Sequence, residues 1–287
     1  GSIVVTSAMG SITLNDTNTD GVALITNGTG DILIDAGALI EINGSVVIEI
    51  GNIAVISDAS VTQSTDVVLT TQGGDIAINA GTTITVEIGG AAISNGGDIV
   101  YTAETDLIVG DVDASGADST TAEGSIVLNA VTGNLTVNDL NADGIALITN
   151  GTGDILIDAG ALIEINADVV AEIGNINVVA IQSVAQNLDV DVTTAGGDIT
   201  VVAGTTITTA SGGVTSSAGG NISYTGESDV IVGDMDASGA NSASEGSIVV
   251  TSAMGSITLN DTNTDGVALI TNGTGDILID AGALIEI

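Results

Sequence analysis

A short motif, glycine followed by Asp, Asn or Ser and then Ile, opens twelve successive segments of this chain. In the first 123 residues the segments begin at intervals of 29, 21, 23, 23 and 27 residues. The motif begins at Gly1, Gly30, Gly51, Gly74, Gly97, Gly124, Gly153, Gly174, Gly197, Gly220, Gly246 and Gly275. A repeat this short predicts stacked layers that share one core, because each segment is too small to bury a core of its own.

Each segment continues with a strand-like alternation. The third residue is always Ile, the fifth is always apolar, and the seventh is Ala, Ser or Gly. Alternate residues of a strand share one face, so these three columns should point inward. Each segment has room for three short strands, such as DILIDA, ALIEI and SVVIEI in residues 31–50, with Gly or Asn at the bends.

The predicted fold is therefore all-β: a parallel β-solenoid with about five coils in each repeat of 122 to 123 residues. Right-handed coiling is expected from strand twist. Helices are disfavoured because no 3.6-residue periodicity appears. An antiparallel sandwich of separate domains is the structural alternative.

A longer repeat contains the short one. Residues 1–42 recur unchanged at 246–287, and residues 124–165 are a close variant. This predicts one continuous rod made of unit 1 (1–123), unit 2 (124–245) and the start of a third unit (246–287). Such a tandem array would continue end to end.

Composition excludes several functions. The chain has 37 acidic residues and no Lys, Arg or His, whereas nucleic acids and anionic membrane surfaces bind positive charge. No apolar run approaches the roughly 18 residues that a membrane helix needs, so neither nucleic-acid binding nor direct membrane insertion is expected. The absence of His, Lys, Arg and Cys also predicts that the protein is not an enzyme. Glycoside hydrolysis by paired carboxylates and ice binding by Thr ladders are weaker alternatives.

The loop NDTNTDG at 15–21 predicts a calcium site. It returns as NDLNADG at 138–144 and as NDTNTDG at 260–266. The pattern Asp-x-Asn-x-Asp-Gly resembles the start of an EF-hand loop, in which alternate side chains converge on one ion and glycine permits the turn. Asn27 stands where such a loop has its twelfth-position acid, so the site would be partial. The predicted ligands are the side chains of Asp16, Asn18 and Asp20 with the carbonyl of Val22, and correspondingly Asp139, Asn141, Asp143 and Asp261, Asn263, Asp265.

A second acidic loop has the same ligand spacing. The stretch DMDASGANSASE at 234–245 places acidic or hydroxyl residues at positions 1, 3, 5 and 12, and DVDASGADSTTAE at 111–123 has one additional residue before its Glu. The predicted ligands are Asp234, Asp236, Ser238 and Glu245, and in the first copy Asp111, Asp113, Ser115 and Glu123. The alternative for both loops is an ordinary polar turn, since Asp, Asn, Ser and Gly are common turn residues.

Two surface features predict partners of the rod. Asp75 and Asp98 share the second position of adjacent coils, where carboxylates about 4.8 Å apart repel by roughly 0.9 kcal/mol in water. Because the chain has no basic residue, only solvent cations are expected to neutralise this pair. The fourth position should point outward yet is mostly apolar, which predicts lateral contact with another copy or a covering loop. Its residues are Val4, Leu33, Ala54, Ala77, Val100, Val127, Leu156, Asn177, Thr200, Ser223, Val249 and Leu278.

The stretches GDILIDAGALIEI and GGDIAINAGTTITV resemble the repeats of filamentous haemagglutinin-type proteins and of giant strand-repeat adhesins on bacterial surfaces. In that family a glycine opens each coil of a right-handed β-helix, and the resemblance implies a secreted fibre or stalk. The expected function is a non-enzymatic extracellular structural protein at the cell surface: a calcium-stabilised segment of a fibre, stalk or matrix filament. The alternative is the arm of a surface adhesin that binds a cell or surface ligand.

Overall fold

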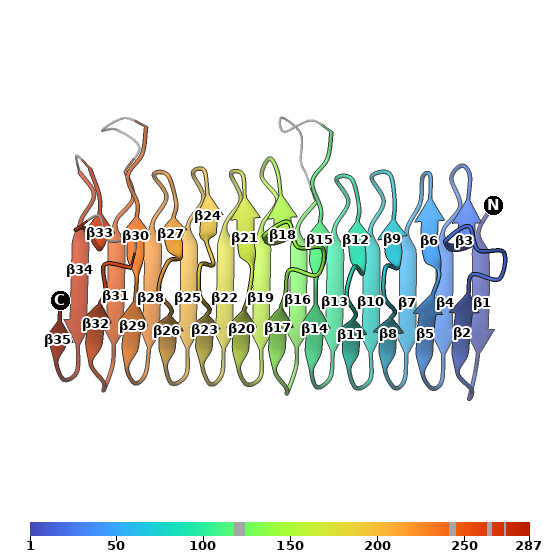
Figure 1. Cartoon of the computed structure of the whole chain (residues 1–287), viewed down its shortest axis with the longest axis horizontal. Helices are drawn as coiled ribbons and strands as arrows, with labels where there is room; N and C mark the ends of the chain where they lie inside the picture. Colours follow the sequence, from blue (N-terminus) through green and yellow to red (C-terminus); the bar gives the residue numbers. More distant parts are fainter. Residues whose placement is uncertain (118–123, 241–244, 263–265, 273) are drawn as a thin grey trace.

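The computed structural model describes residues 1–117, 124–240, 245–262, 266–272 and 274–287. Its regular elements in these ranges are all β-strands, arranged side by side in one long row with the two termini at opposite ends (Figure 1). One turn of the chain makes three short strands, as in β4 (Ile32–Ala36), β5 (Ile40–Asn43) and β6 (Ser45–Ile48). The predicted β-solenoid is confirmed.

The strands form three sheets along the rod, with 12, 12 and 11 strands among the described residues. The first sheet contains β1 (Ile3–Ser7), β4, β7 (Ile53–Ser57), β10 (Ile76–Ala80), β13 (Ile99–Ala103), β16 (Ile126–Ala130), β19 (Ile155–Ala159), β22 (Ile176–Ala180), β25 (Ile199–Ala203), β28 (Ile222–Gly226), β31 (Ile248–Ser252) and β34 (Ile277–Ala281). The second contains β2 (Ile12–Asn15), β5, β8 (Val61–Gln63), β11 (Ile84–Val86), β14 (Leu107–Val109), β17 (Leu135–Val137), β20 (Ile163–Ile165), β23 (Val184–Gln186), β26 (Ile207–Thr209), β29 (Val230–Val232), β32 (Ile257–Leu259) and β35 (Ile285–Glu286). The third contains β3 (Val22–Thr26), β6, β9 (Val68–Thr70), β12 (Ala91–Ile93), β15 (Asp111–Asp113), β18 (Ile145–Thr149), β21 (Asp168–Ala171), β24 (Val192–Thr194), β27 (Val214–Ser216), β30 (Asp234–Asp236) and β33 (Leu269–Ile270).

Strands of successive coils pair in parallel and in register. In the first sheet Ile32 of β4 faces Ile3 of β1 on one side and Ile53 of β7 on the other. Within β4 the side chains of Ile32, Ile34 and Ala36 are buried, whereas Leu33 and Asp35 point outward. The predicted inward columns are therefore confirmed, and the antiparallel alternative is wrong.

The glycine that opens each coil stands where two coils approach closely. A Cβ atom at Gly74 would lie 1.9 Å from the carbonyl oxygen of Gly51, and one at Gly97 would lie 2.1 Å from the carbonyl oxygen of Gly74. No side chain fits at such distances. The column of glycines is thus required by the stacking of backbone on backbone.

The second position of each coil forms a hydrogen-bonded ladder along the rod. Asp31 Oδ1 accepts the backbone N–H of Asn52 at 2.9 Å, and Asn52 Oδ1 accepts that of Asp75 at 2.8 Å. Backbone amides one coil further on supply partial positive charge directly to this acidic column, which the expectation of solvent cations alone did not include. Neutralisation of the net charge by solvent cations stays a prediction.

The fourth position points outward as predicted. Val4, Leu33, Ala54 and Ala77 are consecutive partners in the first sheet, and none of their side chains is buried. An apolar stripe therefore follows the outer face of this sheet, interrupted by polar Asn177, Thr200 and Ser223. Its role in lateral contact stays a prediction.

A candidate metal site between two coils

The loop between β17 and β18 is folded around one of its own aspartates. Asp139 Oδ1 accepts the backbone N–H groups of Asn141 and Ala142 at 3.2 and 2.6 Å, and Asp139 Oδ2 accepts that of Gly144 at 2.8 Å. Ala142 and Gly144 have φ angles of 65° and 95°, a left-handed conformation that glycine adopts at low cost. The motif Asp-x-Asn-x-Asp-Gly thus closes a tight turn that gathers its acidic side chains.

The first copy of the loop has the same geometry. Asp16 Oδ2 accepts the N–H of Gly21 at 2.7 Å, and Asn18 Nδ2 donates to Asp20 Oδ2 at 2.8 Å. The amide of Gly21, followed by those of neighbouring loop residues, lowers the pKa of Asp16 against the opposing effect of burial. The backbone N–H of Val22 donates to Asp20 Oδ1 at 3.0 Å. The structure therefore brings Asp16, Asn18 and Asp20 together, and calcium binding there stays a prediction.

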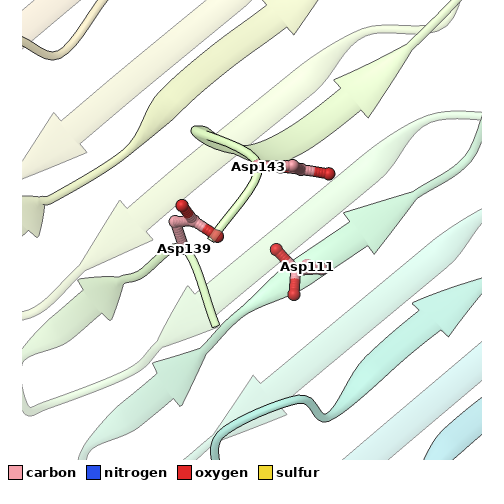
Figure 2. Close-up of side chains that lie close together, drawn as sticks. All are labelled: Asp111, Asp139 and Asp143. Atoms are coloured by element: carbon pink, nitrogen blue, oxygen red, sulfur yellow. The ribbon is translucent and has the colours of Figure 1, made fainter. Parts of the chain in front are cut away.

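In the second copy a third carboxylate joins from the preceding coil. Asp111 lies on β15, whereas Asp139 and Asp143 lie in the loop that precedes β18. One carboxylate oxygen from each of the three residues lies within 4.8 Å of the other two. Figure 2 shows the three side chains gathered at this point, with Asp111 facing the loop. The cluster therefore spans two coils.

Asp111 is the unusual member of the cluster. Its side chain is only 8 % exposed, and neither of its carboxylate oxygens has a hydrogen-bond partner in the part of the chain that the structure describes. Burial, and next the negative charges of Asp139 and Asp143, raise its pKa to about 6; the nearby amide of Leu140 acts in the opposite direction without forming a hydrogen bond. Buried carboxylates are normally hydrogen-bonded or bound to a cation, so Asp111 lacks a partner that its position demands.

Leu140 holds the loop against the preceding coil. Its side chain packs against the core and lies over Gly110, where an added Cβ would be 2.2 Å from Leu140 Cδ1. Its carbonyl oxygen accepts the N–H of Gly89 at 3.0 Å. Glycine at position 110 therefore makes room for Leu140, which brings Asp139 and Asp143 to Asp111.

A groove of about 230 Å³ opens beside the cluster. Asp111, Asp113, Asn141 and Asp143 contribute its polar lining. Carboxylate and amide oxygens are the ligands preferred by hard divalent cations, which complete their shells with water. The groove thus offers an ion access to oxygen ligands and room for part of its hydration shell.

The other residues of the first DVDASG loop have different contacts. Asp113 Oδ1 accepts the N–H of Ser115 at 2.8 Å. The Ser115 hydroxyl is buried and has no hydrogen-bond partner within the described ranges. The backbone N–H and C=O of Gly116 both bond to the side-chain amide of Asn150, at 2.9 and 2.8 Å. Glu123 lies outside the described residues.

The DMDASG copy shows two further contacts. Asp236 Oδ1 accepts both the N–H and the hydroxyl of Ser238. Glu245 Oε2 accepts the backbone N–H groups of Thr274 and Gly275, in the turn before the next coil. Glu245 is therefore engaged with a later part of the chain.

The last loop, at 260–266, is described in part. Asp261 Oδ2 accepts the N–H of Gly266 at 2.8 Å, as the equivalent aspartates do in the earlier loops. Asp234 Oδ2 accepts the N–H of Thr262 at 3.1 Å and its hydroxyl at 2.7 Å. Asn263 and Asp265, two predicted ligands, lie outside the described residues.

Sequence reasoning treated the two acidic motifs as separate sites and so missed the contact between them. Asp111 precedes Asp139 by 28 residues and Asp234 precedes Asp261 by 27, which is about one coil. Acidic residues one coil apart become spatial neighbours in a solenoid. Comparing motif spacing with coil length could therefore have predicted that the two motifs meet.

Comparison with models of known protein families, with characterised proteins and with solved structures finds no match for this chain. The resemblance to haemagglutinin-type repeats accordingly stays a prediction. Across the described ranges, no helix has the length and apolar character needed to cross a membrane.

Proposed function

We propose that this chain is a non-enzymatic segment of an extracellular fibre, stalk or matrix filament, stabilised by calcium. The observation that carries the proposal is Asp111, a buried carboxylate that has no hydrogen-bond partner among the described residues and faces two more carboxylates from the next coil. A divalent cation there would offset most of the negative charge of the cluster and join the two coils. Its effect would be mechanical, because it would link layers of the rod along its axis.

The size of the cluster suits calcium. Calcium binds six to eight oxygen atoms at about 2.3 to 2.6 Å, so oxygens on opposite sides of one ion are about 5 Å apart. The oxygens of Asp111, Asp139 and Asp143 lie within 4.8 Å of one another, inside that limit. Magnesium needs shorter bonds and more regular geometry, which a cluster drawn from a strand and a loop provides less readily.

A partial site of this kind would need the millimolar calcium found outside cells. Partial loop sites of extracellular modules bind calcium at about 10⁻⁴ to 10⁻³ M, so millimolar calcium would contribute roughly 0.4 to 1.4 kcal/mol per site. One site has a minor effect on a long rod. Repetition of the loops along the array would add these contributions and relieve carboxylate repulsion at each of them.

Titration calorimetry with calcium chloride tests the proposal on the whole chain. We expect binding that Asp111→Asn weakens at least tenfold, since this substitution removes one charged ligand and keeps the size of the side chain. Glu164→Gln is the matched control: it changes net charge equally but lies on the second sheet, in β20. Absence of binding by the unaltered chain, or equal weakening by both substitutions, would contradict calcium at this site.

The fibre itself is tested by electron microscopy of the native assembly. We expect long unbranched rods, single or in bundles, because the repeats continue from coil to coil without a break in the sheets. Compact particles in place of rods would contradict the structural role.

A further inference from the structure

The two described contacts between a DxDASG strand and the following loop differ at the residue after the first loop aspartate. The motifs also differ at Val112 and Met235, and at Ala142 and Thr264. Where unit 1 meets unit 2, the residue after the first loop aspartate is Leu140; where unit 2 meets unit 3, it is Thr262. Both occupy the same place above a glycine, since an added Cβ at Gly110 would meet Leu140 and one at Gly233 would meet Thr262 Oγ1 at 2.8 Å. The two side chains differ in what they present to the aspartate of the preceding coil: Thr262 has a hydroxyl group that can donate a hydrogen bond, whereas Leu140 is apolar.

Thr262 donates hydrogen bonds to Asp234, the aspartate of the preceding coil. Its hydroxyl donates to Asp234 Oδ2 at 2.7 Å and its backbone N–H donates to the same oxygen at 3.1 Å. Hydrogen bonds to a charged acceptor are among the stronger ones in proteins. At this junction the protein itself compensates part of the negative charge.

Leu140 has no side-chain donor to offer. Its side chain is apolar and packs against the core, and its backbone amide lies near Asp111. Among the described residues, neither oxygen of Asp111 has a hydrogen-bond partner. The charge of Asp111 is therefore opposed by burial and by two neighbouring carboxylates. A cation bound at Asp111 would stabilise the protein more than one bound at Asp234, because it would supply a partner that the protein does not provide.

We infer that the residue at position 140 or 262 sets the cation dependence of its junction: Leu140 leaves Asp111 to a divalent cation, whereas Thr262 donates two hydrogen bonds to Asp234 Oδ2 and so weakens cation binding there. Leu140 and Thr262 are positioning residues in this scheme, since neither contributes a side-chain ligand. The inference rests on the proposed calcium site. It adds that two nearly identical junctions of one rod respond differently to calcium.

Exchange of the two residues tests this directly. The chain itself carries Thr at the equivalent place in the loops at 15–21 and 260–266 and Leu in the loop at 138–144, so both side chains are compatible with the loop. The double variant Leu140→Thr/Thr262→Leu has the same composition as the original chain. Asp111→Asn and Asp234→Asn, introduced one at a time into each background, report which junction holds calcium.

In titrations with calcium chloride we expect Asp111→Asn to remove the tightest binding event of the original chain and Asp234→Asn to leave it. In the exchanged chain the two substitutions should trade effects, with affinity at each junction changing by about tenfold. If Asp111→Asn abolishes that binding in both backgrounds, the inference is overturned and the calcium site stands. If the original chain binds no calcium, both are overturned.

Discussion

The side-chain oxygen Oδ1 of Asp75 accepts the backbone N–H of Asp98 at 3.0 Å, one coil further along the rod. Asp98 repeats the arrangement with the N–H of Ser125 at 2.8 Å. An acidic column that would repel itself as a row of isolated charges is stabilised by amides that point into it. A chain without any basic side chain can therefore stack aspartates coil upon coil.

This ladder predicts how Asp75 tolerates substitution. Asp75→Asn keeps an oxygen acceptor for the N–H of Asp98, as Asn52 does for the N–H of Asp75. Asp75→Ala removes it and should lower the free energy of unfolding by about 1 kcal/mol. Urea denaturation of the two variants makes the comparison, and an alanine variant as stable as the asparagine variant would show that the ladder contributes nothing.

The glycine column predicts that the same substitution changes stability differently at two glycines with identical sequences after them. Gly1 and Gly246 begin identical stretches of 42 residues, but a Cβ at Gly246 would lie 1.7 Å from the carbonyl oxygen of Gly220, whereas one at Gly1 meets nothing within 4 Å. Gly246→Ala should therefore cost about 2 to 3 kcal/mol of unfolding free energy, and Gly1→Ala close to nothing. Equal stabilities of these variants in urea would mean that close coil stacking does not explain the glycines.

Asp111 predicts a pH dependence in the absence of metal. Its pKa is raised to about 6, above the value near 4 expected in the unfolded chain. Between these values the folded state keeps a proton that the unfolded state has lost, so the free energy of unfolding in chelator should fall as pH rises from about 4 to 6. The loss is at most about 3 kcal/mol, and solvent in the groove reduces it.

The control for this pH dependence is Asp111→Asn, which cannot titrate. Many carboxylates of the chain become charged over the same range, so only the difference between the two proteins reports on Asp111. Denaturation in chelator at several pH values should give a shallower fall for the variant. Parallel curves would show that Asp111 has an ordinary pKa.

The apolar stripe on the first sheet predicts lateral association of rods. Replacing Leu33, Leu156 and Leu278 by Lys places charge at the same strand position in three coils, within β4, β19 and β34. We expect bundling to disappear while the strand content measured by circular dichroism is unchanged, because these side chains point away from the core.

The matched control places the same charges on a different face. Thr13, Thr136 and Thr258 point outward from the second sheet, in β2, β17 and β32. Their replacement by Lys changes net charge equally and should leave bundling intact. Loss of bundles with both sets would indicate a general charge effect, and bundles that survive the leucine substitutions would mean that the stripe is not the contact surface.

The fold could be predicted because its signal is local and repeated. The third, fifth and seventh residues of every segment are Ile, an apolar residue and a small residue, which specifies the buried side of the strand. The same pattern in twelve segments allows only stacked layers to bury every column. Sequence alone explains glycine by its conformational freedom at the bends between strands. In the structure, the glycine that opens a coil is required because the backbones of successive coils are in contact there. This contact can be recognised only once the coils are stacked.

The candidate site could be predicted in part. The spacing of Asp139, Asn141 and Asp143 was sufficient to gather these side chains, since each is held by bonds within its own loop. Asp111 lies close to these side chains because Leu140 packs over Gly110. These two residues are 30 positions apart, and no local sequence motif predicts their contact. The opposite behaviour of Thr262 likewise depends on one hydroxyl and its distance from Asp234.

Calcium stabilisation is tested most directly by thermal unfolding of this chain in millimolar calcium and in chelator, followed by circular dichroism. A contribution of roughly 0.4 to 1.4 kcal/mol per site predicts a melting temperature higher in calcium by about 1 to 5 °C for each site that binds the ion, with a smaller total difference for Asp111→Asn. Equal melting temperatures in calcium and chelator for the unaltered chain would contradict it, and would leave the acidic loops as polar turns closed by their own hydrogen bonds.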